Sequence, residues 1–186
     1  MENKERMEEL VKLAVGGDAR SFAELYESVY KDLYKSAYYT LGNSHDAENV
    51  VSDTALDAFA GINKLRDPKN FRAWIFRILS NKCNKYIRGY IKNREFVSEV
   101  PIEEYLDISV AEGDSIKTAE DKSIIEQAFS VLSIEEKEIV TMTVYGEMDS
   151  GEIASSMNIN RNTVRSKYSR ALRKMRQCLG GDANDR

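Results

Sequence analysis

Cysteine, histidine and proline are scarce in this sequence of 186 residues, and each shortage excludes a class of protein. Cys83 and Cys178 are the only cysteines and His45 is the only histidine. They are too few and too scattered for a zinc site or a disulfide framework, so we expect two reduced thiols on helices and no bound metal. Pro68 and Pro101 are the only prolines, which leaves long stretches free to form helix.

Long apolar runs and strand patterns are also missing. No window approaches the roughly 18 to 20 unbroken apolar residues of a membrane-spanning helix. The first 20 residues mix charges with apolar side chains instead of forming an apolar signal core. Runs of alternating apolar and polar residues are absent, whereas helical periodicity recurs throughout. The sequence therefore predicts an all-α protein that works in the cytoplasm and has no membrane partner.

Catalytic motifs are lacking as well. The sequence has one histidine and shows no cluster of metal ligands and no glycine-rich phosphate-binding loop. Few of its side chains are therefore suited to catalysis. We therefore predict that the chain is not an enzyme and needs no cofactor.

The net charge of −4 conceals four blocks of opposite sign. Residues 1–60 carry net −6, residues 61–94 net +9, residues 95–138 net −10 and residues 139–186 net +3. Two basic blocks in an acidic chain predict two separate DNA contacts, together with an acidic surface for another partner. For any single block, the alternative is that its charges only solvate helix faces.

The acidic block contains the expected domain boundary. Its first part, residues 95–117, includes Pro101 and Gly113 and shows no sustained helical stripe, so it is predicted to be an acidic linker. Two small helical domains follow from this, an N-terminal domain at residues 1–94 and a C-terminal domain at residues 118–186.

Capping signals in the C-terminal domain predict a helix-turn-helix. Two capping boxes mark helix starts, formed by Ser133 with Glu136 and by Asp149 with Glu152. A short helix is expected from about Ser150 to Met157. Asn158 can end it in the left-handed conformation, and Asn160 can cap the next helix. Two helices joined by so short a turn must cross steeply.

The helix after Asn160 divides into an apolar stripe and a basic face. The stripe predicted to be buried consists of Val164, Tyr168, Ala171, Leu172 and Met175. The basic face contains no carboxylate and suits the major groove of DNA, where arginine reads guanine edges. The candidate DNA-binding residues are Arg161, Asn162, Arg165, Ser166, Lys167, Ser169, Arg170, Arg173 and Lys174. The best candidates for base edges are Arg165, Ser166, Ser169 and Arg170, and the phosphate candidates are Arg161, Lys167, Arg173, Lys174 and Arg176.

The N-terminal domain shows three helical stretches, at residues 22–41, 45–62 and 71–90, with a basic turn at residues 63–70. The third stretch has a broad apolar stripe, made of Phe71, Ile75, Ile78, Leu79, Cys83, Tyr86 and Tyr90. Trp74 lies outside that stripe, with Arg77, Asn81, Asn84, Lys85 and Arg88. An indole among cations can stack on an unpaired base; the alternative is that Trp74 packs under the neighbouring helix.

Taken together, these segments resemble the bacterial sigma factors of RNA polymerase, the sigma-70 family, and within it the extracytoplasmic function (ECF) group. The runs FAELYESVY, DAENVV and FRAWIFRILSNKCNKYIR are similar to sigma region 2. The run LSIEEKEIVTMTVYGEMDSGEIASSMNINRNTVRSKYSRALRKMR is similar to region 4. The resemblance implies a protein that binds core RNA polymerase and directs promoter-specific initiation by reading the minus-35 element and opening the minus-10 element.

The resemblance also implies roles for individual residues. Asp46, Glu48 and Asp53 would contact core RNA polymerase, whose beta-prime and beta subunits are the expected partners together with promoter DNA. The helix-turn-helix face described above would read the minus-35 element. The minus-10 element would be bound by Lys64, Arg66, Lys69, Asn70, Trp74, Arg77, Asn81, Lys85 and Arg88. An anti-sigma factor is a further partner that the resemblance suggests.

A dimeric helix-turn-helix repressor or activator with a sensing domain is the alternative function. It would protect its operator without polymerase, and it gives no role to the basic block at residues 61–94.

Overall fold

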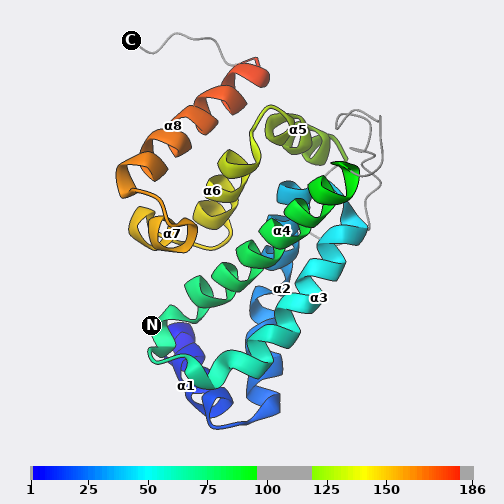
Figure 1. The fold of residues 1–186 in the computed structure, drawn as a ribbon. Coiled ribbons are helices and arrows are strands. Elements are labelled where there is room, and N and C mark those ends of the chain that lie inside the picture. Colours follow the sequence, from blue (N-terminus) through cyan, green and yellow to red (C-terminus); the bar gives the residue numbers. More distant parts are fainter. Residues whose placement is uncertain (1, 96–118, 181–186) are drawn as a thin grey trace.

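The computed structural model describes residues 2–95 and 119–180, and all regular structure in these ranges is helical (Figure 1). The helices are α1 Glu2–Val15, α2 Ala19–Leu41, α3 Ser44–Gly61, α4 Phe71–Glu95, α5 Ala119–Ser130, α6 Ile134–Val144, α7 Ser150–Met157 and α8 Arg161–Cys178. Two short 3-10 turns, η1 Ile62–Lys64 and η2 Pro68–Asn70, connect α3 to α4. The all-α prediction is confirmed. The predicted linker at residues 95–117 lies, apart from Glu95, outside the described residues.

Helices α1 to α4 form one bundle, and α2 runs through its centre (Figure 1). The apolar face of α2 is fully buried at Leu25, Val29 and Leu33, against α1, α3 and α4. Asp18 caps its start by accepting a hydrogen bond from the Ser21 amide at 2.9 Å. Gly42 ends it with φ of 74°, in the left-handed region that glycine enters without strain. Helix α1 was not predicted, because its charges mask a short apolar stripe.

Helices α5 to α8 form the second domain, and its predicted caps are confirmed. Both capping boxes are present, at the starts of α6 and α7. Asn158 ends α7 with φ of 54°, and the Asn160 side chain accepts from the Asn162 amide at 2.8 Å at the start of α8. The α7–α8 pair is therefore a helix-turn-helix, as its turn residues predict.

Helix α4 presents three different faces. Successive residues are about 100° apart on a helix, so positions four apart form one row. The first row, which includes Ile75, Leu79 and Cys83, is buried in the N-terminal bundle. The second row, Arg72, Phe76, Ser80 and Asn84, faces the C-terminal domain through the contacts described below. The third row, made of Arg77, Asn81, Lys85 and Arg88, is exposed.

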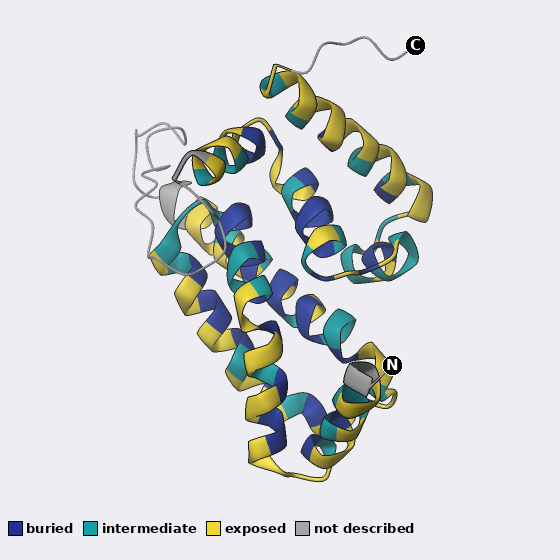
Figure 2. Ribbon diagram, turned by 180° about the vertical axis from the view of Figure 1, so that it is seen from behind, coloured by how far each residue is buried: buried dark blue, intermediate teal, exposed yellow. Residues whose placement is uncertain are grey.

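The two domains pack directly on each other where α6 lies against α2 (Figure 2). Ser80 and Asn84 of α4 also donate to the Glu138 carboxylate of α6, at 2.9 and 2.7 Å. The Tyr39 ring of α2 stacks on Phe129 with ring centres 4.5 Å apart and on Tyr145 at 6.1 Å. The Tyr38 hydroxyl donates to Glu126 at 2.8 Å. Arg72 donates to the backbone carbonyl of Tyr145. The buried residues of both domains consequently form one continuous cluster.

Three residues predicted to be buried are exposed instead. Leu172 is 42% exposed, because it lies outside the row of Val164 and Ala171 that is buried where α8 packs against α5, α6 and α7. Tyr86 and Tyr90 lie on the solvent side of the last turns of α4. Burial and a hydrogen bond with Asp46 raise the pKa of Tyr86 to about 12, so its hydroxyl end is engaged while part of its ring stays in water.

Candidate nucleic-acid interface

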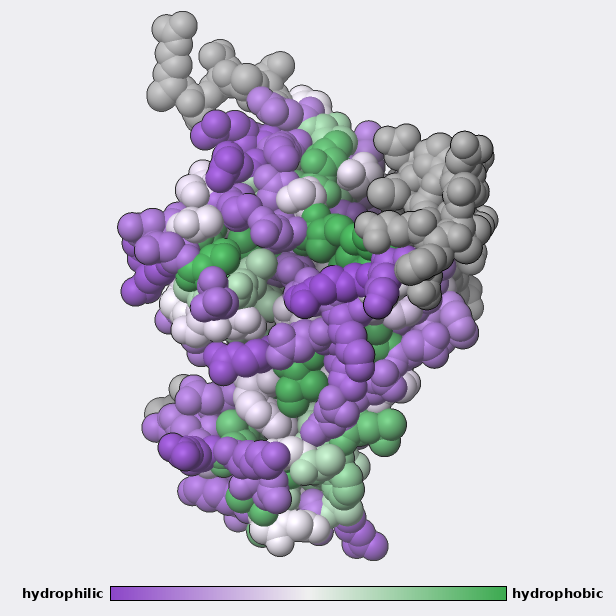
Figure 3. Space-filling view, viewed as in Figure 1, coloured by the Kyte–Doolittle hydropathy of each residue, from purple (hydrophilic) through white to green (hydrophobic). Residues whose placement is uncertain are grey.

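One side of helix α8 packs against the rest of its domain, and the opposite side is exposed. Val164 and Ala171 are buried against α6 and α7. The opposite side is exposed and contains Asn162, Arg165, Ser166, Ser169, Arg170 and Arg173. Hydrophilic residues dominate this part of the surface (Figure 3). A helix that projects arginine, asparagine and serine in this way has the donors needed to read base edges in a major groove.

Two lysines of the predicted DNA-binding set are turned toward α6 instead. Lys167 pairs with Glu135, and Lys174 pairs with Glu136 at 2.8 Å. Burial alone would raise the pKa of Glu136. The hydrogen bond from Lys174 and those of Ser133 outweigh burial and leave that pKa below its ordinary value. These pairs fix the rotation of α8 on α6, so they orient the exposed arginines.

The turn before α8 is held by polar contacts of its own. Arg161 donates through Nε to the Ser150 hydroxyl at 2.9 Å, which ties α8 to the first residue of α7. Hydrogen bonds from the amides of Glu152 and Gly151, followed by the charges of Arg161 and Arg165, lower the pKa of Asp149. Asp149 is therefore ionised near neutral pH and can stabilise the N-terminus of α7.

The exposed row of α4 forms a second basic face, well separated from α8 in the sequence. Arg77, Asn81, Lys85 and Arg88 follow one another at spacings of three and four residues, so they line one side of the helix. Trp74 begins this row and is half-buried. A methyl group placed on Gly61 would meet its ring at 3.7 Å, and the Phe71 ring centre lies 6.2 Å away. The indole therefore rests against the end of α3 and borders the basic row.

The basic turn between α3 and α4 directly precedes the helix that carries Trp74. Lys64, Arg66, Lys69 and Asn70 are all exposed. Asp67 organises the turn by accepting from the Lys69 amide at 3.0 Å and from the Asn70 side chain at 3.2 Å. The turn and the row of α4 thus present exposed cationic side chains on both sides of the half-buried Trp74 in the sequence.

The acidic candidates on α3 occupy a different surface. Glu48 and Asp53 are exposed, whereas Asp46 is engaged with Tyr86. Two exposed apolar side chains, Leu56 at 68% and Phe59, share this part of α3 and were not singled out from the sequence. Their positions three and six residues after Asp53 could have indicated them, because exposed large apolar side chains beside charges mark interaction sites.

Two family sequence patterns match the chain. Residues 25–91 match the pattern described as Sigma-70 region 2, and residues 122–175 match Sigma-70, region 4. The chain belongs to the sigma-70 family. The order and spacing of the two regions, together with relatives named as ECF sigma factors, place it in the ECF group. Family membership brings with it promoter-specific initiation of transcription through binding to RNA polymerase.

Curated relatives extend over nearly the whole chain. The ECF RNA polymerase sigma factor BldN of Streptomyces coelicolor is 29% identical over 182 residues, which is 96% of this chain and 67% of the relative. The ECF RNA polymerase sigma factor SigW of Bacillus subtilis is 26% identical over 178 residues, 91% of this chain and 94% of the relative.

Solved structures share the fold. The sigma factor RpoE from Bartonella quintana, in complex with the anti-sigma factor NepR, aligns with a TM-score of 0.75 at 23% identity and covers 88% of this chain and 99% of its own. CnrH in complex with the cytosolic domain of CnrY aligns with a TM-score of 0.63 at 22% identity, covering 96% of this chain and 99% of its own. In the ranges 2–95 and 119–180, no helix combines the length and apolar composition needed to cross a membrane.

Proposed function

We propose that this sigma factor is a non-catalytic specificity subunit that acts with RNA polymerase in the cytoplasm. In this proposal, α8 reads the minus-35 element, and α4 with the basic turn binds the opened minus-10 element. The observation that supports it most is the pair of exposed cationic faces on two different domains, one lined by arginines and serines and the other bordered by Trp74.

The α8 face suits recognition of duplex DNA because some of its side chains can contact base edges and others can contact phosphates. Arg165 and Arg170 have the geometry to donate two hydrogen bonds to one guanine, and Ser166 and Ser169 can reach neighbouring bases. Arg173 lies one turn further along and is suited to a phosphate. Lys167 and Lys174 serve this face indirectly, since their pairs with Glu135 and Glu136 set the orientation of the helix.

The α4 face suits an unpaired strand. Its cations can track a phosphate backbone, and an aromatic ring at the edge of such a track can stack on an extruded base. Unpairing a base costs a few kcal/mol, and stacking can offset about 1–3 kcal/mol per base. Opening at the minus-10 element then needs no ATP.

The α3 surface is proposed to bind core polymerase. Glu48 and Asp53 would pair with cations of the partner, and Leu56 would supply apolar contact area. The sigma factor RpoE from Bartonella quintana, which has a similar fold, is bound to the anti-sigma factor NepR. An anti-sigma factor for this chain would act most directly by covering the surfaces assigned here to polymerase and DNA.

Reversing charge on α3 tests the proposal. Glu48→Lys and Asp53→Lys together should abolish co-purification with core polymerase and therefore runoff transcription, because two attractive contacts become repulsive. Glu9→Lys, which reverses one exposed charge on α1, is the control and should bind core normally. A wild-type chain that fails to direct initiation with core polymerase, yet protects DNA alone, would instead indicate a repressor.

Trp74 gives a second test, since stacking and packing have different consequences. We expect Trp74→Ala to weaken binding of the holoenzyme to a single-stranded minus-10 oligonucleotide by about 10-fold, from the loss of about 1–3 kcal/mol of stacking. Trp74→Phe should retain most of that binding. If Trp74→Ala lowers the melting temperature and leaves strand binding unchanged, then the ring only packs against α3.

A further inference from the structure

Helix α1 has no part in the proposed function, yet it packs against the basic turn. It lies beside η1 and η2, the two short helices that connect α3 to α4 (Figure 1). Within residues 5–15, its exposed side chains carry charges of both signs and form no cationic face; they are Glu5, Arg6, Glu9, Lys12 and Leu13. What α1 can offer the turn is therefore support, and not a contact of its own with a DNA strand.

Every third residue from Ile62 to Phe71 is turned into the protein. Ile62 and Phe71 are buried, and Leu65 and Pro68 between them are half-buried. Three residues make one turn of a 3-10 helix, so residues at this spacing share one side. We call these four residues the anchor row. The six residues between them are all exposed and include the cations assigned above to the minus-10 element: Asn63, Lys64, Arg66, Asp67, Lys69 and Asn70.

The shape of the turn and its position on the bundle have different sources. Its shape is held from within, by the Asp67 contacts described above, by the Leu65 amide donating to the Ile62 carbonyl at 2.9 Å, and by the Phe71 amide donating to the Pro68 carbonyl. Its position depends on the anchor row, since Leu65 packs against the buried cluster to which Ile62 and Phe71 belong. A change beneath the anchor row should therefore move the turn as a unit.

Val11 is the buried side chain of α1 that is best placed to meet the anchor row. Within residues 5–15, Val11 and Ala14 are the buried positions. Arg6 pairs with Glu24 of α2, which marks the edge of α1 that lies along α2. At about 100° per residue, Val11 lies about 140° from Arg6 around the helix and Ala14 about 80°. Val11 is thus farther from the α2 edge, toward the side that remains for η1 and η2.

We propose that α1 is the support on which the basic turn is seated, and that Val11 and Leu65 are positioning residues for capture of an unpaired minus-10 base. This inference rests on the proposed function. Capture requires the outward donors of the turn to lie at hydrogen-bond distance from the base while Trp74 stacks. A displacement of about 1 Å is enough to weaken such a positioned contact severely. Helix α1 then influences which base is accepted without touching DNA.

Removing apolar atoms from either side of this contact tests the support. With core polymerase, Val11→Ala and Leu65→Ala should each weaken binding to a single-stranded minus-10 oligonucleotide on the order of 10-fold, because the outward donors shift. Fluorescence anisotropy measures the affinity for four oligonucleotides that differ only in the base that the parent discriminates best. The four affinities should become more equal in both variants. Leu65→Met, which nearly preserves the side-chain volume, should retain the affinity and the base preference.

Val51 supplies the matched control. It is a valine on α3 that is as buried as Val11, each being 1% exposed. It precedes Gly61 by ten residues, which is about 15 Å along the helix. Val51→Ala should lower the melting temperature about as much as Val11→Ala, yet bind the four oligonucleotides like the parent. Equal losses of strand binding in the two variants would reflect lost stability alone and would overturn the proposal.

The double variant Val11→Ala/Leu65→Ala shows whether α1 acts through the turn. Since both changes loosen the same seat, its loss of affinity should be smaller than the product of the two single losses. A loss equal to that product would mean that α1 and the turn act independently, and it would overturn the support. Parent-like strand binding by both single variants would do the same. Failure of the parent holoenzyme to bind the strand or to initiate would overturn the proposed function instead. All binding is measured below the melting temperature of every variant, so that unfolding does not contribute.

Discussion

Replacing both Arg165 and Arg170 with alanine is expected to reduce initiation at minus-35-dependent promoters on the order of 100-fold. Each good arginine–guanine pair contributes about 1–3 kcal/mol of discrimination, and about 1.4 kcal/mol corresponds to tenfold in affinity. Both side chains are exposed on α8, and within residues 5–92 and 121–180 neither forms an ion pair. Runoff transcription with core polymerase measures the effect, while co-purification with core should be unchanged.

Two further variants distinguish sequence-specific contacts with bases from sequence-independent attraction to phosphates. Arg173→Ala, at a proposed phosphate contact, should weaken binding to all sequences alike and lower the salt dependence by about one unit of slope. Lys31→Ala removes an exposed cation on α2, far from α8 in the fold, and should have little effect. Normal initiation by the Arg165/Arg170 double variant would mean that α8 presents a different face to DNA.

Replacing Ile139 with alanine is expected to destabilise the C-terminal domain by about 2–5 kcal/mol, the usual range for a fully buried isoleucine. Ile139 is 0% exposed and lies on α6, which supports α8 on one side and contacts α2 on the other. The free energy of unfolding, followed by circular dichroism in urea, measures the change. If the predicted boundaries at residues 1–94 and 118–186 delimit units that fold separately, then the variant should unfold in two transitions.

Ile134 supplies the matched control for this experiment. It is an isoleucine on the same helix but is exposed, so Ile134→Ala should change stability by less than about 0.5 kcal/mol. A single shared transition for Ile139→Ala would show that the domains unfold together, with the docked interface as the source of the coupling. A loss no greater than that of Ile134→Ala would contradict the burial of Ile139.

Features set by near neighbours in the sequence were predictable from it. Both capping boxes, the left-handed Asn158 and the cap at Asn160 each depend on residues at most four apart. The same local chemistry defined α7 to the residue and indicated a helix-turn-helix. The basic face of α8 followed from helical periodicity, because a helix anchored through Val164 and Ala171 must present the opposite side to solvent.

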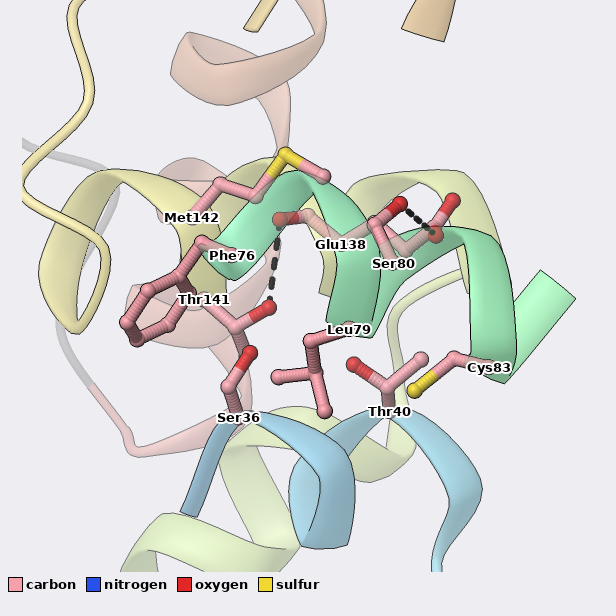
Figure 4. Close-up of a pocket in the computed structure, with 9 residues that line it drawn as sticks. All are labelled: Ser36, Thr40, Phe76, Leu79, Ser80, Cys83, Glu138, Thr141 and Met142. Carbon is pink, nitrogen blue, oxygen red and sulfur yellow. Dashed lines mark hydrogen bonds between the residues drawn. The ribbon is translucent and has the colours of Figure 1, made fainter. Parts of the chain in front are cut away.

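Features that depend on the second domain were not predictable in this way. Phe76 and Ser80 were not included in the predicted apolar stripe of α4, yet both are buried where the helix faces α6 (Figure 4). Tyr39 of α2 stacks on Phe129 across the interface, a contact between residues 90 positions apart. The inward pairing of Lys174 with Glu136 joins residues 38 positions apart. A helical wheel contains no information about such partners.

Because α4 has three faces with different surroundings, we expect this helix to tolerate substitutions far better than insertions or deletions. An added residue near its start would rotate everything beyond it by about 100°. The apolar row would then turn toward α6, the row that faces α6 would turn into water, and the cationic row would turn into the N-terminal bundle. Natural variants of this chain should therefore vary in side chains along the exposed row of α4, while insertions and deletions accumulate outside the helix.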